Sequence, residues 1–232
     1  MITPSAEPNS PAPAPKSSWA LRAAFVVLGL AAWFWTQSLI GRRAFPAGTV
    51  GDGLHILSAP VHRYLFEHAQ AANSLLIVSS GFIDLFGILL LGRSIFGPSI
   101  RPFLSLLLVF GLRQLCQGLC ALPPPEEMIW RYPGFPSLLV TYGVANDLFF
   151  SGHTAIAALG AIELASLGRR WLMVAGVLVA LFEVSAVLAL RAHYTMDVFT
   201  GAVTALLVAG IAFRLAPPLD KLLARAFHPG RE

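Results

Sequence analysis

The chain has 232 residues, of which 56% are hydrophobic and only 12% are charged, and its mean hydropathy is +0.70. This composition excludes an ordinary soluble domain and favours a protein whose solvent is the bilayer. The net charge of +4 is small and the basic residues are scattered between apolar segments, which argues against nucleic-acid binding and leaves membrane lipids as the expected partners.

A polar tail precedes the first apolar segment. Residues 1–18 consist mainly of Pro, Ala and Ser, with little to bury, and they predict a disordered tail. The apolar segment 19–40 is too long for the core of a signal peptide, and Arg42 and Arg43 follow it directly. We therefore expect it to be a retained membrane anchor.

Six apolar segments are long enough to cross about 30 Å of hydrocarbon as helices. They cover residues 19–40, 74–92, 102–122, 150–168, 170–190 and 196–216. The sequence therefore predicts an all-α, multi-pass membrane protein with six transmembrane helices. In this prediction residues 19–216 form one membrane domain, and residues 217–232 form a short cytoplasmic tail.

The first long loop, residues 41–73, has its own helical pattern. Apolar residues recur at helical spacing from Val61 to Ala69, which predicts a helix at the membrane interface. The loop also carries three histidines, which we interpret as surface imidazoles in preference to metal ligands: His55, His62 and His68.

The distribution of Lys and Arg predicts the orientation in the membrane. Most basic residues fall on the amino-terminal side of the first predicted helix or on loops that share its face, so both termini are expected in the cytoplasm. The loops that contain His153 and His193 then both emerge on the extracytoplasmic face. The two histidines are therefore expected on the same side of the membrane.

Two short motifs carry the polar chemistry of this sequence. In NDLFFSGHTA, residues 146–155, His153 stands at the start of an apolar run. In RAHYTMDVF, residues 191–199, His193 and Asp197 are four apart, so a helix places them one turn apart on one face. A helix cap explains such a pair equally well when it is taken alone. A second histidine on the same membrane face favours a functional site, because ionisable groups in a membrane are costly.

These motifs resemble a known family. NDLFFSGHTA, followed forty positions later by HYTMD and preceded by LRQLCQGLCALPPP, is similar to the sphingomyelin synthase branch of the type 2 phosphatidic acid phosphatase superfamily. The resemblance implies an enzyme that moves a phosphate-bearing head group from a glycerophospholipid to ceramide. It assigns catalytic roles to His153, His193 and Asp197, and it matches Asp147. The family's Pro-Asp motif between its first two spans has no counterpart in AFPAGTVGDGLH.

The residues in these motifs support a two-step displacement at phosphorus. Neutral His193, oriented by Asp197, would attack to form a phosphohistidine, and protonated His153 would give its proton to the leaving alkoxide. Further residues are expected to bind the substrate phosphate: Arg113, Arg191, and the backbone around Ser151 and Gly152. Asp147 would orient His153 or cap its helix. The mechanism requires no cofactor and no metal, although a metal site and a non-catalytic scaffold remain alternatives.

Other polar residues have two interpretations each. Asp84, Glu163 and Glu183 lie within apolar segments, and we interpret them as polar contacts between helices. An outer loop combines acidic and aromatic residues that suit either a choline or ethanolamine ammonium or an interfacial aromatic belt: Glu126, Glu127, Trp130, Tyr132 and Tyr142.

The absence of a basic first motif from this sequence favours a transferase over a phosphatase. Hydrolases of the superfamily carry a basic first motif and a proline before Ser-Gly-His, whereas here Phe150 precedes Ser151. Fewer fixed cations suit a phosphodiester, which bears one negative charge. The sequence therefore predicts transfer of phosphocholine or phosphoethanolamine to a ceramide or diacylglycerol hydroxyl. A lipid phosphate phosphatase is the alternative, and the oligomeric state is left open.

Overall fold

The computed structural model describes residues 16–42, 50–143 and 148–227, and every regular element in these ranges is a helix. Residues 1–15 of the predicted tail lie outside them. The helices are α1 (Lys16–Gly41), α2 (Gly53–Leu57), α3 (Ala59–Glu67), α4 (Ala69–Phe96), α5 (Arg101–Leu119), α6 (Gly152–Ala165), α7 (Arg170–Ala189) and α8 (Thr195–Phe227). The last helix continues through Pro217 and Pro218, where a separate tail was expected.

The expectation of six membrane-spanning helices is not confirmed. Within the described residues, five helices are long and apolar enough to cross a membrane: α1, α4, α5, α7 and α8. The fourth predicted span became α6, which has only 14 residues and is therefore about 21 Å long at 1.5 Å per residue. Residues 148–151 are irregular chain before α6, and hydropathy did not distinguish them from the helix because most of them are apolar. The protein is nonetheless an all-helical integral membrane protein.

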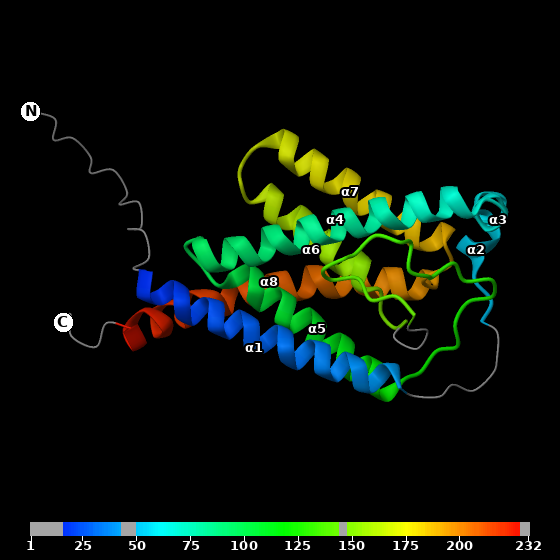
Figure 1. Ribbon diagram of the computed structural model, residues 1–232. Helices are drawn as coiled ribbons and strands as arrows, with labels where there is room; N and C mark the ends of the chain where they lie inside the picture. The colour runs from blue at the N-terminus through cyan, green and yellow to red at the C-terminus, as the bar shows by residue number, and fades with distance from the viewer. Residues whose placement is uncertain (1–15, 43–49, 144–147, 228–232) are drawn as a thin grey trace, which may run out of the picture.

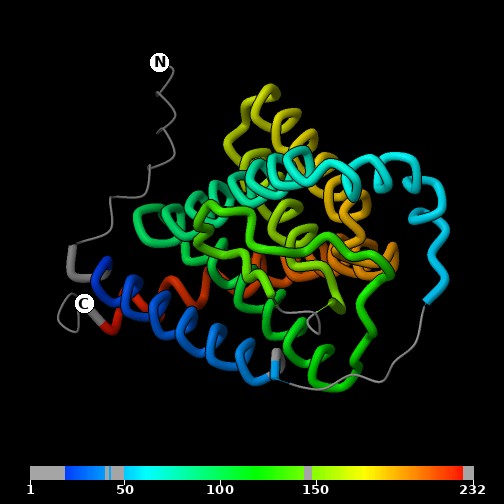
Figure 2. Tube along the Cα trace, turned by 45° about the vertical axis from the view of Figure 1, so that its right-hand side comes forward, coloured from blue at the N-terminus to red at the C-terminus, as the bar shows by residue number. Residues whose placement is uncertain are grey.

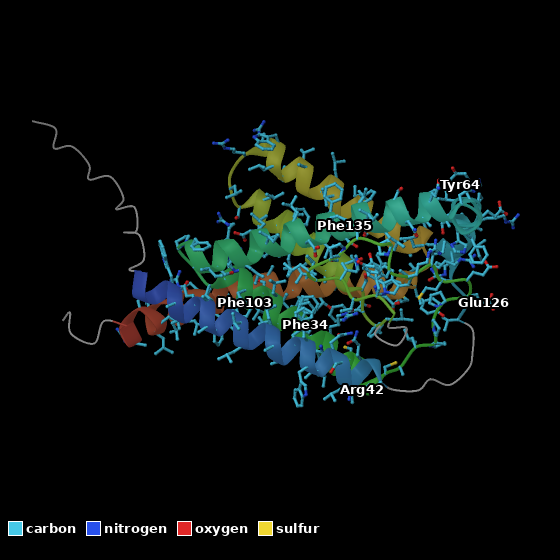
Figure 3. All side chains as sticks on the ribbon, viewed as in Figure 1. Phe34, Arg42, Tyr64, Phe103, Glu126 and Phe135 are labelled. Carbon is cyan, nitrogen blue, oxygen red and sulfur yellow. The ribbon has the colours of Figure 1, made fainter. Side chains whose placement is uncertain are left out.

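The long helices run in alternating directions along one bundle. The start of α1 and the end of α8 lie together at one end, while α2, α3 and the segment between α5 and α6 gather at the other (Figure 1). Tyr64 on α3 and Glu126 mark this second end (Figure 3). The rotated trace shows the same grouping (Figure 2). We call it the loop end of the bundle.

Helix α6 lies inside the bundle, against α4, α7 and α8. It approaches α7 closely, because a Cβ on Gly176 would lie 2.8 Å from the Cα of Ala161. Glu163 of α6 accepts hydrogen bonds from Arg93 of α4 and, at 2.6 Å, from Arg101 of α5. This network confirms Glu163 as a polar contact between helices.

Two further acidic residues lie in the long helices. Glu183 of α7 accepts a hydrogen bond from the Ser79 hydroxyl of α4 at 2.7 Å, as expected for a contact between helices. The same interpretation was wrong for Asp84 of α4, which binds the loop between α5 and α6. Its carboxylate accepts hydrogen bonds from the Ser137 hydroxyl and from the N–H groups of Leu138 (2.8 Å) and Leu139 (2.9 Å). This anchor holds irregular chain, whose backbone groups need partners, inside the bundle.

The predicted interfacial helix is present as α3, with Val61 and Tyr64 exposed. The interpretation of all three loop histidines as surface groups was wrong for two of them. His55 and His62 are buried, and each bonds a backbone carbonyl of the α7–α8 region: His193 O and Ala189 O, both at 2.9 Å. Hydropathy and spacing did not reveal these partners because they lie more than 120 positions away.

Candidate active site

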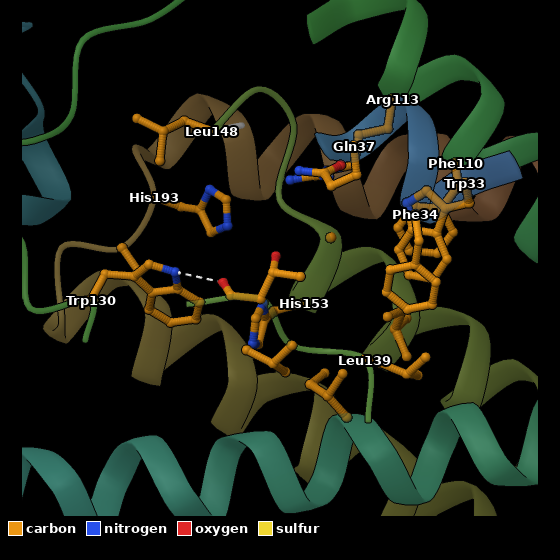
Figure 4. A pocket seen from close by; sticks show the side chains of 16 residues that line it. Trp33, Phe34, Gln37, Phe110, Arg113, Trp130, Leu139, Leu148, His153 and His193 are labelled. Atoms are coloured by element: carbon orange, nitrogen blue, oxygen red, sulfur yellow. Dashed lines mark hydrogen bonds between the residues drawn. The ribbon is translucent and has the colours of Figure 1, made fainter. Parts of the chain in front are cut away.

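One pocket at the loop end contains both motif histidines. Its walls come from α1, α5, the 120–151 segment, the start of α6 and the turn before α8. Figure 4 shows the imidazoles of His153 and His193 on the same pocket, with Trp130 on one side and the aromatic rings of α1 and α5 at the far side. The ring centroids of the two histidines are 6.4 Å apart.

His193 lies in the turn that joins α7 to α8, and Asp197 lies in the first turn of α8. Nδ1 of His193 is 3.6 Å from Oδ2 of Asp197, which also accepts the N–H of Tyr194 at 2.9 Å. Both side chains are buried. Asp197 therefore caps its helix and faces the imidazole at the same time, so the two interpretations of the H-x-x-x-D spacing are compatible.

His153 stands at the start of α6. The hydroxyl of Ser151, the N-cap, accepts the N–H of Thr154 at 3.3 Å, which leaves the Ser151 side chain committed to the helix. The N–H of Ser151 donates to the carbonyl of Asp197 at 3.0 Å, so the two motifs are joined through backbone. Gly201 permits this approach, because a Cβ there would lie 2.6 Å from Ser151 O.

Arg113 extends from α5 to the same pocket and is buried. Its Nε donates to the carbonyl of Phe150 at 2.7 Å, and Nη1 donates to the amide oxygen of Gln37 on α1 at 3.3 Å. Gly152 also lines the pocket, and a Cβ added to it would lie 3.5 Å from Arg113 Nε. Arg113 thus orients the Ser-Gly-His backbone and brings positive charge to the histidines.

Arg191, another predicted substrate-binding residue, does not line this pocket. Arg191 binds the outer loop, where Nη1 donates to Glu126 O at 3.2 Å and to a Glu127 carboxylate oxygen at 3.3 Å. Its backbone has φ 50°, a value that non-glycine residues rarely adopt. Asp147 lies outside the described residues. Glu127 also approaches His62, at 3.6 Å, so its carboxylate is engaged in the outer loop.

Aromatic residues make up much of the pocket wall. Trp130 meets the ring of His153 edge to face, with centroids 5.2 Å apart, and its Nε1 donates to Thr141 O at 3.1 Å. Trp33, Phe34 and Phe110 line the other side. We did not anticipate the aromatic residues of α1 or Gln37. The signal for Gln37 was present, since an amide within an apolar span is costly unless it has partners.

A second, apolar cavity adjoins this pocket. It lies among α1, α4, α5 and α6, and four residues line both spaces: Trp33, Phe110, Leu139 and Ile156. Every other side chain that lines it is a leucine or phenylalanine, apart from the glycines. The histidine pocket therefore shares part of its wall with a space that suits hydrocarbon.

In ranges 16–42, 50–143 and 148–227, no three His, Cys, Asp or Glu side chains form a group that would hold a metal ion. Burial raises the pKa of the Tyr194 hydroxyl, which is beside His193 in the chain. Tyr194 therefore remains a neutral hydrogen-bond donor, and its hydroxyl donates to Pro123 O at 3.1 Å.

The fold and pocket define an integral membrane protein with a buried pair of histidines beside an apolar cavity. The model of the AtPDCT1/2 family, whose members are phosphatidylcholine:diacylglycerol cholinephosphotransferases, matches residues 52–214. Because this match covers most of the chain, the chain belongs to the AtPDCT1/2 family, and its class is that of lipid phosphotransferases. No curated protein matches the chain in a sequence search.

This membership corrects the assignment to the sphingomyelin synthase branch. The motifs that carried the assignment are a Ser-Gly-His at a helix start and a His one turn before an Asp. Neither motif specifies the head group or the acceptor lipid. The motifs do not distinguish families of related activity.

Proposed function

We propose that this protein transfers phosphocholine from phosphatidylcholine to diacylglycerol through a phosphohistidine on His193. Family membership supports the reaction, and the histidine pair supports the mechanism. The observation that carries the proposal is the single pocket that combines the two imidazoles, Arg113 and an adjoining apolar cavity.

In the first step Nε2 of His193 attacks phosphorus, and the bond from phosphorus to the glycerol oxygen breaks. Protonated His153 gives its proton to that oxygen, which releases diacylglycerol. Asp197 faces Nδ1 and stabilises the tautomer that leaves Nε2 bare. Both imidazoles line one pocket, so a phosphoryl group bound there would lie near both.

In the second step a new diacylglycerol hydroxyl loses its proton to His153 and attacks the phosphohistidine. The bond between nitrogen and phosphorus breaks, and phosphatidylcholine with different acyl chains forms. Leaving group and acceptor belong to the same chemical class, so one apolar cavity serves both in turn. This accounts for one hydrocarbon-lined space beside the histidines, and it predicts ping-pong kinetics.

Charge and aromatic residues support the choice of head group. Arg113 is the cation that lines the pocket, which suits a phosphodiester with one negative charge. The rings of Trp33, Phe34, Phe110 and Trp130 offer faces for a quaternary ammonium. We place the pocket on the extracytoplasmic face, because Arg93, Arg101, Arg169 and Arg170 belong to the opposite end of the bundle.

The test uses purified protein in vesicles with choline-labelled phosphatidylcholine and a diacylglycerol of different acyl composition. We expect label in phosphatidylcholine that carries the acyl chains of the added diacylglycerol, and no such product with His193→Ala. Label released into water as free phosphocholine, with none in the new lipid, would establish hydrolysis and contradict the proposal.

A further inference from the structure

Helix α8, which carries Asp197, begins at Thr195, and the side chain of the residue before the helix does not cap it. That residue is Tyr194, whose hydroxyl bonds Pro123 O. The N–H of Thr195, the first residue of α8, donates instead to Oδ2 of Asp52 at 2.5 Å. The Thr195 hydroxyl donates to Oδ1 of the same carboxylate, also at 2.5 Å. A residue 143 positions away therefore caps α8.

The same carboxylate also caps α2. Oδ1 of Asp52 accepts the N–H groups of Leu54 at 2.9 Å and His55 at 3.2 Å. Burial raises the pKa of Asp52, but the hydrogen bonds from Thr195 and His55 outweigh burial and hold the pKa below its usual value. Asp52 is therefore ionised across the pH range in which imidazoles titrate. Its charge-assisted hydrogen bonds join the start of α2 to the start of α8.

His55 holds the turn next to this cap. Its Nε2 lies 2.9 Å from the carbonyl oxygen of His193, and because a carbonyl only accepts, Nε2 is the donor. The His55 ring stacks on Tyr194 with centroids 5.6 Å apart. His55 is buried. Residues 52–55, which we call the brace, thus bond the chain on both sides of Tyr194.

We propose that Asp52 and His55 are positioning residues that hold His193 in line with Asp197 and the phosphoryl group. Neither residue lines the pocket, so neither touches the substrate. The brace acts through the backbone of the turn at His193 and the first residue of α8. This inference rests on the proposed function, because His193 is the group that it positions.

The proposal requires an effect on turnover and not on lipid binding. Asp52→Asn keeps the size of the side chain, but the amide retains one acceptor oxygen and adds a donor. Thr195 N–H or the α2 amides then lose their partner, and the start of α8 shifts. We expect kcat to fall by about 10- to 100-fold, since a displacement of about 1 Å costs up to about 100-fold. The apparent KM for diacylglycerol should not change.

A matched control lies at the opposite end of the bundle. Oδ1 of Asp220 accepts the N–H of Ile100, just before α5, at 2.9 Å across 120 positions. Asp220→Asn replaces a charged acceptor at a helix start by a neutral one, as Asp52→Asn does, but away from the histidines. We expect it to lower the melting temperature without changing kcat. Equal losses of kcat in Asp52→Asn and Asp220→Asn, or a rise in KM for Asp52→Asn alone, would overturn the proposal.

Two further comparisons separate positioning from general destabilisation. Thr195→Val removes one donor to Asp52, so its effect on kcat should nearly vanish in the Asp52→Asn background, whereas additive effects would contradict the brace. His55→Gln retains an N–H donor, and His55→Phe retains only the stacking on Tyr194. We expect His55→Gln to keep more activity, and the reverse order would also count against the proposal.

Hydrogen exchange tests the brace without any substrate. In Asp52→Asn the amides of residues 193–198 should exchange faster than in the wild type, and in Asp220→Asn they should not. If the wild type transfers no phosphocholine, the proposed function fails, while this measurement still decides whether the brace orders the turn. Unchanged exchange in Asp52→Asn, or faster exchange with unchanged kcat, would overturn the positioning role.

Discussion

At the scale of single residues, the pocket depends on how His193 is oriented. Its Nδ1 faces Asp197 at 3.6 Å, and this nitrogen and Oδ1 of Asp197 have no hydrogen-bond partner among the described residues. Buried polar atoms without partners are rare in native structures. A small movement of the turn when phosphate binds would bring the imidazole N–H onto the carboxylate, as in other sites that tighten with substrate.

Removal of either group gives the first prediction. His193→Ala should abolish transfer, because no nitrogen remains to accept the phosphoryl group. Asp197→Asn should lower kcat by up to about 10⁴-fold, since the amide favours the wrong tautomer. Label incorporation from choline-labelled lipid measures both. Transfer near the wild-type rate in either variant would contradict the mechanism.

A second prediction concerns the close contact at Gly201. Gly201→Ala places a Cβ 2.6 Å from Ser151 O, so α8 and the Ser-Gly-His backbone must move apart. We expect a loss of at least about tenfold in kcat, because the two histidines sit on these two segments. Gly210→Ala is the matched control, since nothing lies within 4 Å of its Cβ. The control should retain activity, and its helix should gain roughly 0.5–1 kcal/mol.

At the scale of elements, the short α6 decides where the pocket lies. A helix of about 21 Å is shorter than the roughly 30 Å of hydrocarbon, so its histidine end is recessed within the bundle. Residues 137–139 of the preceding loop are anchored on Asp84 of α4. This arrangement surrounds the two histidines with protein, and it would limit the access of water to the proposed phosphohistidine.

The anchor at Asp84 gives the third prediction. Asp84→Asn leaves at least one of the loop donors Ser137, Leu138 and Leu139 without its acceptor, so the loop that carries Trp130 loosens. We expect slower transfer to diacylglycerol and a larger share of phosphocholine released to water. Product analysis measures the ratio of transfer to hydrolysis. An unchanged ratio in Asp84→Asn would show that the loop does not exclude water.

At the scale of the whole molecule, the bundle brings a polar pocket and a hydrocarbon space together. The apolar cavity draws on α1, α4, α5 and α6, which are distant in the sequence. The two spaces share Trp33 and Leu139, so in the proposed function the glycerol region of a lipid would lie beside these two residues. The outer faces of the helices remain exposed and apolar, as the bilayer requires.

Filling the apolar cavity gives the fourth prediction. Leu30 of α1 lines it, so Leu30→Trp should reduce transfer to long-chain diacylglycerol more than transfer to a dioctanoyl acceptor. Leu28→Trp is the control, because Leu28 is 69% exposed on the same helix. Competition between the two acceptors in one vesicle population measures the preference. Equal losses for both chain lengths would remove the cavity from the substrate path.

Sidedness gives the fifth prediction. A cysteine at Gly134 on the loop end, with Cys116 and Cys120 replaced by alanine, should react with an impermeant thiol reagent in whole cells. A cysteine at Arg170, the first residue of α7 at the opposite end, should react only after permeabilisation. The reverse pattern would place the pocket on the cytoplasmic face.

The sequence by itself determined the helical membrane class and the two motifs. Both depend on local patterns: apolar runs of membrane length, and a spacing of four that puts His193 and Asp197 on one helical face. The tertiary structure also places His153 beside His193, as alternating helices predict. The acceptor lipid did not follow from the motifs, because they contain no residues that specify an acceptor.

The tertiary structure alone decided the depth of α6, the separation of Arg113 from Arg191 and the brace at Asp52. Hydropathy counts apolar residues, so it did not distinguish a 14-residue helix from a full span when irregular apolar chain precedes it. Arginine carries the same charge wherever it lies, and only packing brings Arg113 to Phe150 and Arg191 to Glu126. Asp52 bonds Thr195 across 143 positions, a distance over which local propensity specifies nothing and only the packed bundle fixes the partner.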